Sequence, residues 1–291
     1  MALRAKPAEI KPVKRAKILI SGEPGSGKTY FSLQWPNVYF IDTEFGAERE
    51  QYQKKLIESK GVYLGRDDGV NTFEEVIKEM KALATEKHEY KTIVIDSISH
   101  LYNAAAAVAE EKGGSEFGRD KKQANIPSRQ LLRWIDIVPM NVVLIAHQKV
   151  DWSNKEQVKT TYDFYDKAGY LIDIWLEMKG KNFIVRKSRI ESFQENLVFS
   201  REYSKFAELF GSDIINKDVE PIILATEEQV DRIMQLVQSL NISADEVEKL
   251  QKKFDVDEWA ELTQDQIAKG IAYFEAKLTA INPATATKKG K

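Results

Sequence analysis

The residues most suited to chemistry form a glycine-rich segment near the start of the chain, Gly22-Glu23-Pro24-Gly25-Ser26-Gly27-Lys28-Thr29-Tyr30. A glycine, four residues and then Gly-Lys-Thr, directly after the apolar run Ile18-Leu19-Ile20, is typical of a loop whose backbone N–H groups surround phosphates. Lys28 would neutralise the β and γ oxygens of a nucleoside triphosphate, and the Thr29 hydroxyl would bind Mg²⁺. The segment 22–30 is therefore a predicted ATP and Mg²⁺ site. The alternative, a plain connection between a strand and a helix, is disfavoured by the Lys-Thr pair.

A second candidate metal ligand is Asp96, which ends the apolar run Ile93-Val94-Ile95. Open α/β sheets place their ligands at the carboxyl ends of the strands. We therefore expect Asp96 to hold the Mg²⁺ through a water molecule. The alternative is that its carboxylate only caps the following turn.

A third apolar run, 38–41, ends in Asp42-Thr43-Glu44. Here the chain resembles the RecA-type recombinase ATPases, in which a strand between the phosphate loop and the metal aspartate ends in Asp-x-Glu. The resemblance implies that Glu44 is the general base that activates the attacking water, a step that depends on positioning and charge stabilisation. In AAA+ enzymes the base directly follows the metal aspartate, and Ser97 at that place argues against them.

Two later segments extend the resemblance. The run 142–148 is similar to the RecA strand that ends in a γ-phosphate sensor and leads into a DNA-binding loop, which makes Gln148 the sensor candidate and His147 its neighbour. A polar strand end is the alternative. The segment 184–190 is similar to the one whose two cations reach the γ-phosphate of the neighbouring subunit, and Lys187 and Arg189 match them. Such cations stabilise charge in the transition state. Protection of an exposed edge strand is the alternative reason for them.

Composition excludes several other classes. The 291 residues contain no Cys and three separated His, which excludes disulfides, thiolate metal sites and a zinc-ligand pattern. No apolar run approaches the roughly 18 residues of a membrane span, and the first residues lack the apolar stretch of a signal peptide, so we expect a cytoplasmic protein without membrane contact. The net charge of −2 means that any contact with nucleic acid must be local.

Strand-like and helical patterns alternate through the first two-thirds of the chain. Runs rich in β-branched and aromatic residues occur at 17–21, 38–42, 92–96 and 142–146, with helical spacing at 72–84 and 129–137. This alternation predicts an α/β fold, a RecA-like P-loop NTPase with a mainly parallel sheet and helices on both faces. Two further runs, 172–178 and 182–187, predict a hairpin at one edge of the sheet.

The pattern divides the chain into five predicted parts. These are a basic N-terminal arm (1–16), the ATPase core (17–210), a linker (211–225), a small C-terminal three-helix module (226–280) and a disordered tail (281–291). Each module helix opens with a pair typical of a capping box, Thr226 with Gln229, Ser243 with Glu246 and Thr263 with Gln266. Residues 226–278 hold 12 acids against 6 bases. We therefore expect the module to contact protein rather than DNA.

The core as a whole most resembles the bacteriophage single-strand annealing ATPases of the Sak-four type, which look like a trimmed RecA core. The resemblance implies a phage-encoded, ATP-dependent protein that binds single-stranded DNA and promotes strand annealing or homologous recombination. It further implies a homo-oligomer with nucleotide at the subunit interfaces, ATP hydrolysis stimulated by DNA or assembly, and a single-strand-binding protein as a candidate partner. No separate N-terminal polymerisation domain is recognisable, so the basis of assembly stays open.

Two predicted loops would bind the DNA. The first, 113–127, carries the cations Arg119, Lys121 and Lys122, and the second, 149–169, mixes lysines with Trp152, Tyr162, Phe164 and Tyr165. Rings stack on bases while cations follow phosphates, a combination suited to single strands. The acids of the second loop cancel its lysines, and packing of Tyr162, Phe164 and Tyr165 on the core is the alternative.

Two other function classes compete with DNA annealing. A nucleotide-switched assembly or helicase-loader protein would contact only protein partners. A P-loop kinase would need a lid for its acceptor, which the pattern lacks, and Glu44 as a water activator also counts against it. Measuring oligonucleotide binding with and without ATP separates the first two classes.

Overall fold

The computed structural model describes residues 14–65, 68–111, 119–151, 159–254 and 256–281, and its centre is a nine-stranded sheet. The strands run in the order β3-β2-β4-β5-β1-β7-β8-β9, with β6 paired to β5 outside this path. Their bounds are β1 Lys17–Gly22, β2 Val38–Asp42, β3 Val62–Leu64, β4 Thr92–Asp96, β5 Asn141–Asp151, β6 Lys159–Tyr162, β7 Ile174–Lys179, β8 Asn182–Ser188 and β9 Val198–Ser200.

The strands from β3 to β7 in this order are parallel, and β8 and β9 are antiparallel to their neighbours. The parallel strands β1 and β4 are buried along their whole length, which explains their continuous apolar runs. The sheet confirms the predicted α/β class, and β7 with β8 forms the predicted hairpin. The short edge strands β3 and β9 were not predicted.

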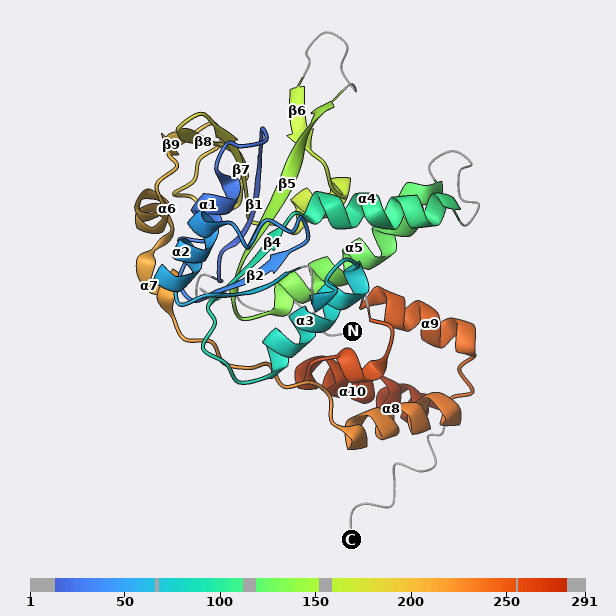
Figure 1. Ribbon diagram of the computed structural model, residues 1–291. Coiled ribbons are helices and arrows are strands. Elements are labelled where there is room, and N and C mark those ends of the chain that lie inside the picture. The colour runs from blue at the N-terminus through green and yellow to red at the C-terminus, as the bar shows by residue number, and fades with distance from the viewer. Residues whose placement is uncertain (1–13, 66–67, 112–118, 152–158, 255, 282–291) are drawn as a thin grey trace.

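Helices cover both faces of the sheet (Figure 1). One face packs against α3 Phe73–Thr85, α4 Ile98–Ala109 and α5 Arg119–Ile137. The other packs against α1 Lys28–Ser32, α2 Glu50–Glu58, α6 Tyr203–Phe210 and α7 Ser212–Asn216. The apolar cores on the two sides are continuous clusters, so the sheet is a fixed platform for the residues at its strand ends.

Strand β5 continues beyond the sheet and pairs with β6, and Figure 1 shows this ribbon projecting from the molecule. The ribbon corrects the prediction of a single loop over 149–169, because β6 and the 3₁₀ helix η3 Asp166–Tyr170 lie inside that range. Tyr162 and Phe164 are buried in the core, against Trp175 and Tyr102 respectively. Tyr165 is partly buried against the same core. Packing, the alternative for these rings, is therefore what the structure shows. Trp152 lies outside the described residues.

The first predicted DNA loop also needs a correction. From Arg119 onward the chain is helical in α5, with Pro127 inside the helix, so Arg119, Lys121 and Lys122 lie on a helix rather than a loop. Residues 113–118 of the predicted loop lie outside the described residues.

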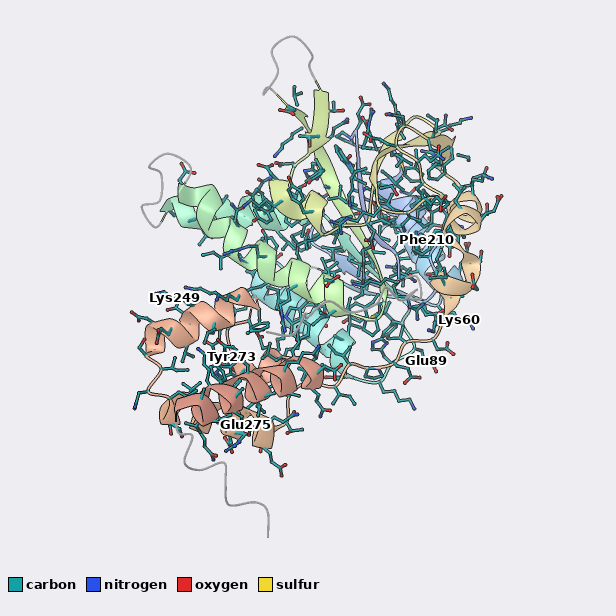
Figure 2. The ribbon with its side chains drawn as sticks, turned by 180° about the vertical axis from the view of Figure 1, so that it is seen from behind. Lys60, Glu89, Phe210, Lys249, Tyr273 and Glu275 are labelled. Carbon is teal, nitrogen blue, oxygen red and sulfur yellow. The ribbon has the colours of Figure 1, made fainter. Side chains whose placement is uncertain are left out.

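The C-terminal residues form α8 Glu227–Ser239, α9 Ala244–Lys253, the short η4 Trp259–Glu261 and α10 Gln264–Ile281 around a small apolar cluster. The capping boxes of α8 and α9 form as predicted, and Thr263 and Gln266 exchange the same pair of hydrogen bonds before α10. Figure 2 shows these helices, marked by Lys249, Tyr273 and Glu275, at a corner of the molecule away from Phe210. Arg133 of α5 connects them to the core by donating to the Glu261 carbonyl at 2.5 Å.

The segment 211–225 contains the helix α7, whose Ile215 is fully buried against the core. Arg15 donates to the carbonyls of Ile214 and Lys217 at 2.8 and 2.7 Å, which fixes the end of α7 to the beginning of β1. None of the helices in the described ranges combines the length and the apolar composition that a bilayer crossing requires.

Candidate functional site

Four strand ends meet around one cavity of about 660 Å³. Strands β2, β4, β5 and β1 are adjacent and parallel, so their carboxyl ends lie at the same edge of the sheet. The register pairs Asp42 with Asp96 and Gly22 with His147. The fold thus brings together, in the wall of the cavity, the predicted site residues Gly22, Pro24, Gly25, Gly27, Lys28, Thr29, Tyr30, Glu44, Asp96 and Gln148.

The glycine-rich loop between β1 and α1 needs glycine at two places. A Cβ on Gly22 would lie 2.7 Å from the carbonyl oxygen of Met178, which leaves no room for a side chain. Gly27 adopts φ +98° immediately before α1, a conformation that other residues rarely take. Lys28 donates from Nζ to the carbonyls of Gly22 and Glu23, both at 2.9 Å, so its cation lies within the loop. Burial lowers the pKa of Lys28.

Thr29 and Asp96 form the candidate metal-binding pair. The Thr29 hydroxyl donates to Asp96 Oδ2 at 2.5 Å, and burial raises the pKa of Asp96 to about 7. Carboxylate and hydroxyl oxygens suit Mg²⁺, which commonly keeps only one or two protein ligands and takes the rest from phosphate and water. Within the described ranges, no three His, Asp or Glu side chains gather so as to hold a metal by themselves. The pair therefore fits a Mg²⁺ ion that arrives with a triphosphate.

The Asp42-Thr43-Glu44 segment places three side chains in three different environments. Asp42 accepts hydrogen bonds from the backbone N–H groups of Glu44 and Ala47 at 3.2 and 2.5 Å, which turns the chain at the end of β2. The buried Thr43 accepts at its hydroxyl from the Ser97 N–H at 2.8 Å, which connects the ends of β2 and β4. Glu44 is then left at the cavity wall, with 39% of its side chain exposed.

Glu44 accepts two hydrogen bonds at the same carboxylate oxygen. His147 Nε2 and Ser97 Oγ both donate to Oε1 at 2.5 Å. The bond from His147, followed by that from Ser97, lowers the pKa of Glu44 to about 2, and the Glu44 bond raises the pKa of His147. Glu44 is therefore ionised throughout the neutral pH range. Burial lowers the pKa of Lys28, and the Glu44 charge offsets part of that shift; burial raises the pKa of Asp96, and the Glu44 charge adds to it.

Gln148 lies at the cavity and also contacts a buried carboxylate on the next strands. Its Nε2 donates to Glu177 Oε1 at 2.7 Å, and Glu177 is 5% exposed. Arg186 donates from Nε to Glu177 Oε2 at 2.5 Å, and the two form an ion pair. These groups line a second, polar cavity of about 710 Å³ that borders the glycine-rich loop at Glu23 and Ser26. Gln148 therefore connects the two cavities.

The structure does not bring Lys187 and Arg189 to the cavity lined by Lys28 and Glu44, called the nucleotide cavity below. Lys187 pairs with Trp175 near the start of β7, and β7 is parallel to β1, so both cations lie at the sheet end opposite the glycine-rich loop. Lys187 donates to the Ile172 and Asp173 carbonyls, and Arg189 to that of Tyr170. Burial lowers the pKa of Lys187 to about 8. Neither cation can act on the nucleotide of its own chain.

Several residues of the site were not singled out from the sequence. Arg49 and Tyr52 of the α2 region line the nucleotide cavity, with the guanidinium 5.9 Å from the ring centroid. Arg201 donates from Nη1 to the Ser26 carbonyl, behind the glycine-rich loop. No local pattern identifies these residues, because Arg201 lies 175 positions after Ser26.

The glycine-rich loop, the Thr29–Asp96 pair and the parallel sheet define a P-loop NTPase domain. Residues 14–179, more than half of the chain, match the family AAA_24, described as an AAA domain, and the chain belongs to that family. The family carries this description although Ser97, rather than a carboxylate, follows Asp96. In this chain the cavity is lined by two carboxylates, Asp96 itself and Glu44, which follows β2.

One similar solved structure is the crystal structure of the RadB recombinase, at 18% identity and a TM-score of 0.42, covering 64% of this chain and 86% of that chain. Similarity at this level carries no functional argument. No curated protein matches the sequence. The predicted P-loop ATPase class is thus confirmed as a P-loop NTPase domain, and the resemblance to bacteriophage annealing proteins stays a prediction.

Proposed function

We propose that this protein is a Mg²⁺-dependent ATPase in which Glu44 activates the attacking water. The observation that carries the proposal is the position of the Glu44 carboxylate, which lines the same cavity as Lys28 and Asp96 and is close enough to influence the ionisation of both. A carboxylate at this place lies beside the groups that bind the terminal phosphates.

Each residue has one role in the proposed reaction. Lys28 neutralises charge on the β and γ oxygens, and Thr29 with Asp96 would hold Mg²⁺, which when bound offsets further phosphate charge. Glu44 accepts a proton from water as the water oxygen bonds to the γ-phosphorus, and the bond from that phosphorus to the β–γ bridging oxygen breaks, releasing ADP. With a pKa of about 2, Glu44 is a weak base. It therefore both orients the water and accepts its proton as the bond to phosphorus forms.

We further propose that Lys187 and Arg189 act on the nucleotide of a neighbouring copy. Their place at the sheet end opposite the glycine-rich loop leaves them no role in their own cavity. A cation supplied by a second copy stabilises the transition state and makes hydrolysis depend on assembly. The isolated subunit is then a poor ATPase, and the working form is a homo-oligomer with ATP at its interfaces.

The partner that we propose for this assembly is single-stranded DNA, bound at the β5–β6 ribbon during annealing or recombination, a role in line with the resemblance to the phage annealing proteins. A single-strand-binding protein is the candidate protein partner, and the bacterial cytoplasm the proposed location. The support is that His147 and Gln148 lie at the root of the ribbon and contact carboxylates in the two cavities. A strand bound to the ribbon is thereby coupled to the nucleotide site.

One observation favours a second candidate function, a nucleotide-switched assembly or helicase-loader protein. The rings expected to stack on bases, Tyr162 and Phe164, are buried, and Lys149 is paired with Asp163 and Asp166 at 3.6 and 3.7 Å. This part of the ribbon therefore offers little to a nucleic acid. A protein partner would be compatible with both features.

The experiment measures ATP turnover and oligonucleotide binding on the same preparation. Mg²⁺-dependent release of phosphate that EDTA and Lys28→Ala both abolish supports the ATPase. Filter binding of a labelled oligothymidylate, with and without ATP, tests the DNA partner. For Z phosphate contacts, the logarithm of the affinity should fall with the logarithm of salt concentration at a slope of about −0.7Z. ATP turnover without any ATP-responsive DNA binding would support the loader class, and no turnover in any state of assembly would refute the ATPase.

A further inference from the structure

Two side chains from neighbouring strand ends, Ser97 and His147, donate to one carboxylate oxygen of Glu44. Ser97 follows β4, His147 belongs to β5, and Glu44 follows β2. Ser97 Oγ and His147 Nε2 each lie 2.5 Å from Glu44 Oε1, and 3.4 Å from each other. An ionised carboxylate only accepts hydrogen bonds, so Nε2 of His147 must carry the proton in this contact.

We propose that His147 and Ser97 are positioning residues that hold Glu44 by Oε1 and so leave Oε2 directed to the attacking water. The proposal rests on the ATPase function proposed above and assigns roles that the P-loop pattern does not. Both hydrogen bonds found for the Glu44 carboxylate, within the described part of the chain, use Oε1. Two donors on one oxygen fix the rotation of the carboxylate and keep the other oxygen available.

The two donors are themselves fixed by the fold. The backbone N–H of His147 donates to Ser99 Oγ at 2.8 Å, and its backbone carbonyl accepts from the backbone N–H of Asp163 at 2.8 Å. The Ser97 N–H donates to Thr43 Oγ1 at 2.8 Å, and Ser97 Oγ accepts from the His100 N–H at the start of α4. Glu44, on the turn after β2, is thus held by donors at the ends of β4 and β5.

The position of His147 gives this arrangement a second consequence. His147 is the last β5 residue paired with β1, and Gln148 is the first paired with β6. A displacement at the root of the β5–β6 ribbon therefore moves the donor of Glu44. Positioning of the water is sensitive to such displacements, since an error of about 1 Å can cost on the order of 100-fold in rate.

The test compares His147→Gln, whose amide keeps an N–H donor at about the place of Nε2, with His147→Leu, which fills a similar volume without a donor. We expect His147→Leu to lower kcat by about tenfold to 100-fold, with the Kd for ATP within about twofold of wild type, and His147→Gln to stay within about threefold in kcat. His88→Leu is the matched control, because His88 bonds to the Leu83 carbonyl outside the cavity. We expect it to leave kcat unchanged.

Equal rates for the Leu and Gln variants, or a His147→Leu variant that hydrolyses ATP like wild type, would overturn the positioning role. Should His147→Leu fail to bind ATP, His147→Asn replaces it, since its amide is too short to reach Oε1. A loss in that variant with retained affinity supports the proposal, and wild-type turnover overturns it. Failure of the proposed function is recognised separately, by a wild-type protein without turnover or by a Glu44→Gln variant that hydrolyses normally.

Discussion

Asp96→Asn should stabilise the nucleotide-free protein while it removes the response to Mg²⁺ and ATP. Asp96 is a buried carboxyl whose pKa burial raises from 3.8 to about 7. Because the folded-state pKa lies above the unfolded one, the folded protein binds this proton more tightly. The stability that Asp96 contributes is therefore complete below pH 3.8, falls as the pH rises to about 7, and stays low above that.

The size of the effect follows from the rise of about three pKa units, at about 1.4 kcal/mol each. Ionised Asp96 then costs the folded protein about 4 kcal/mol at pH 8, an upper figure because 7% of the residue remains exposed. Asparagine carries no charge and keeps an acceptor for Thr29. About two of the three pKa units lie between pH 5 and the folded-state pKa of about 7. The gain in the free energy of unfolding that Asp96→Asn produces should therefore be about 3 kcal/mol larger at pH 8 than at pH 5.

Urea unfolding of wild type and Asp96→Asn at pH 5 and pH 8 measures this difference, and other titrating groups cancel in the comparison. With Mg²⁺ and ATP at about 100 times the wild-type Kd, wild type should gain about 2.7 kcal/mol, and Asp96→Asn much less. A variant that is no more stable than wild type at pH 8, or whose gain does not change with pH, would refute the assignment of a charged, buried Asp96.

Three further substitutions test other parts of the account. Gly27→Ala should raise the Kd for ATP about tenfold, because Gly27 has φ +98° and a Cβ would lie 3.0 Å from Arg201 Nη1. The control is Gly180→Ala, because Gly180 also has a positive φ, +58°, but lies outside the nucleotide cavity. We expect this control to leave the Kd unchanged. Phe164→Ala should lower the free energy of unfolding in urea by about 3–5 kcal/mol, because the ring is fully buried. Tyr170 is 74% exposed, so the control Tyr170→Ala should change that free energy by less than about 0.5 kcal/mol. Equal effects of the two substitutions would contradict the packing of the ribbon base. Lys187→Ala should hydrolyse no ATP alone yet restore turnover when mixed with Glu44→Gln, and mixtures that stay inactive would count against catalysis shared between chains.

Much of the site could be predicted because its residues are adjacent in sequence and each local pattern has a physical cause. The glycine-rich loop predicted its own backbone geometry, since Gly22 and Gly27 meet needs that only glycine satisfies. The predicted bounds of β2 and β4 agree with the structure because β4 is buried at every position, and β2 at every position except Tyr39, between their neighbours. Asp96 could be placed at the site because parallel strands end at a common edge.

The remaining features depend on contacts between distant segments. Glu177 is a single acid in an apolar strand, and its burial is explained by the hydrogen bonds that it accepts from Gln148, Thr160 and Arg186. The rings of Tyr162 and Phe164 were indistinguishable from stacking residues until the positions of Trp175 and Tyr102 were known. The predicted loop 113–127 overlaps α5, which continues through Pro127 although proline lacks the N–H of a helical hydrogen bond. Packing of α5 against α3 and α4 offsets that loss.

The role of Glu44 is tested by measuring ATP binding and a single turnover of hydrolysis for wild type and Glu44→Gln. Glutamine keeps the size of the side chain and can still accept a hydrogen bond, but it cannot accept the proton from water. For Glu44→Gln we expect a Kd for ATP within about threefold of wild type and a hydrolysis rate lower by about 10²- to 10⁴-fold. A Glu44→Gln protein that cleaves bound ATP at the wild-type rate would contradict that role.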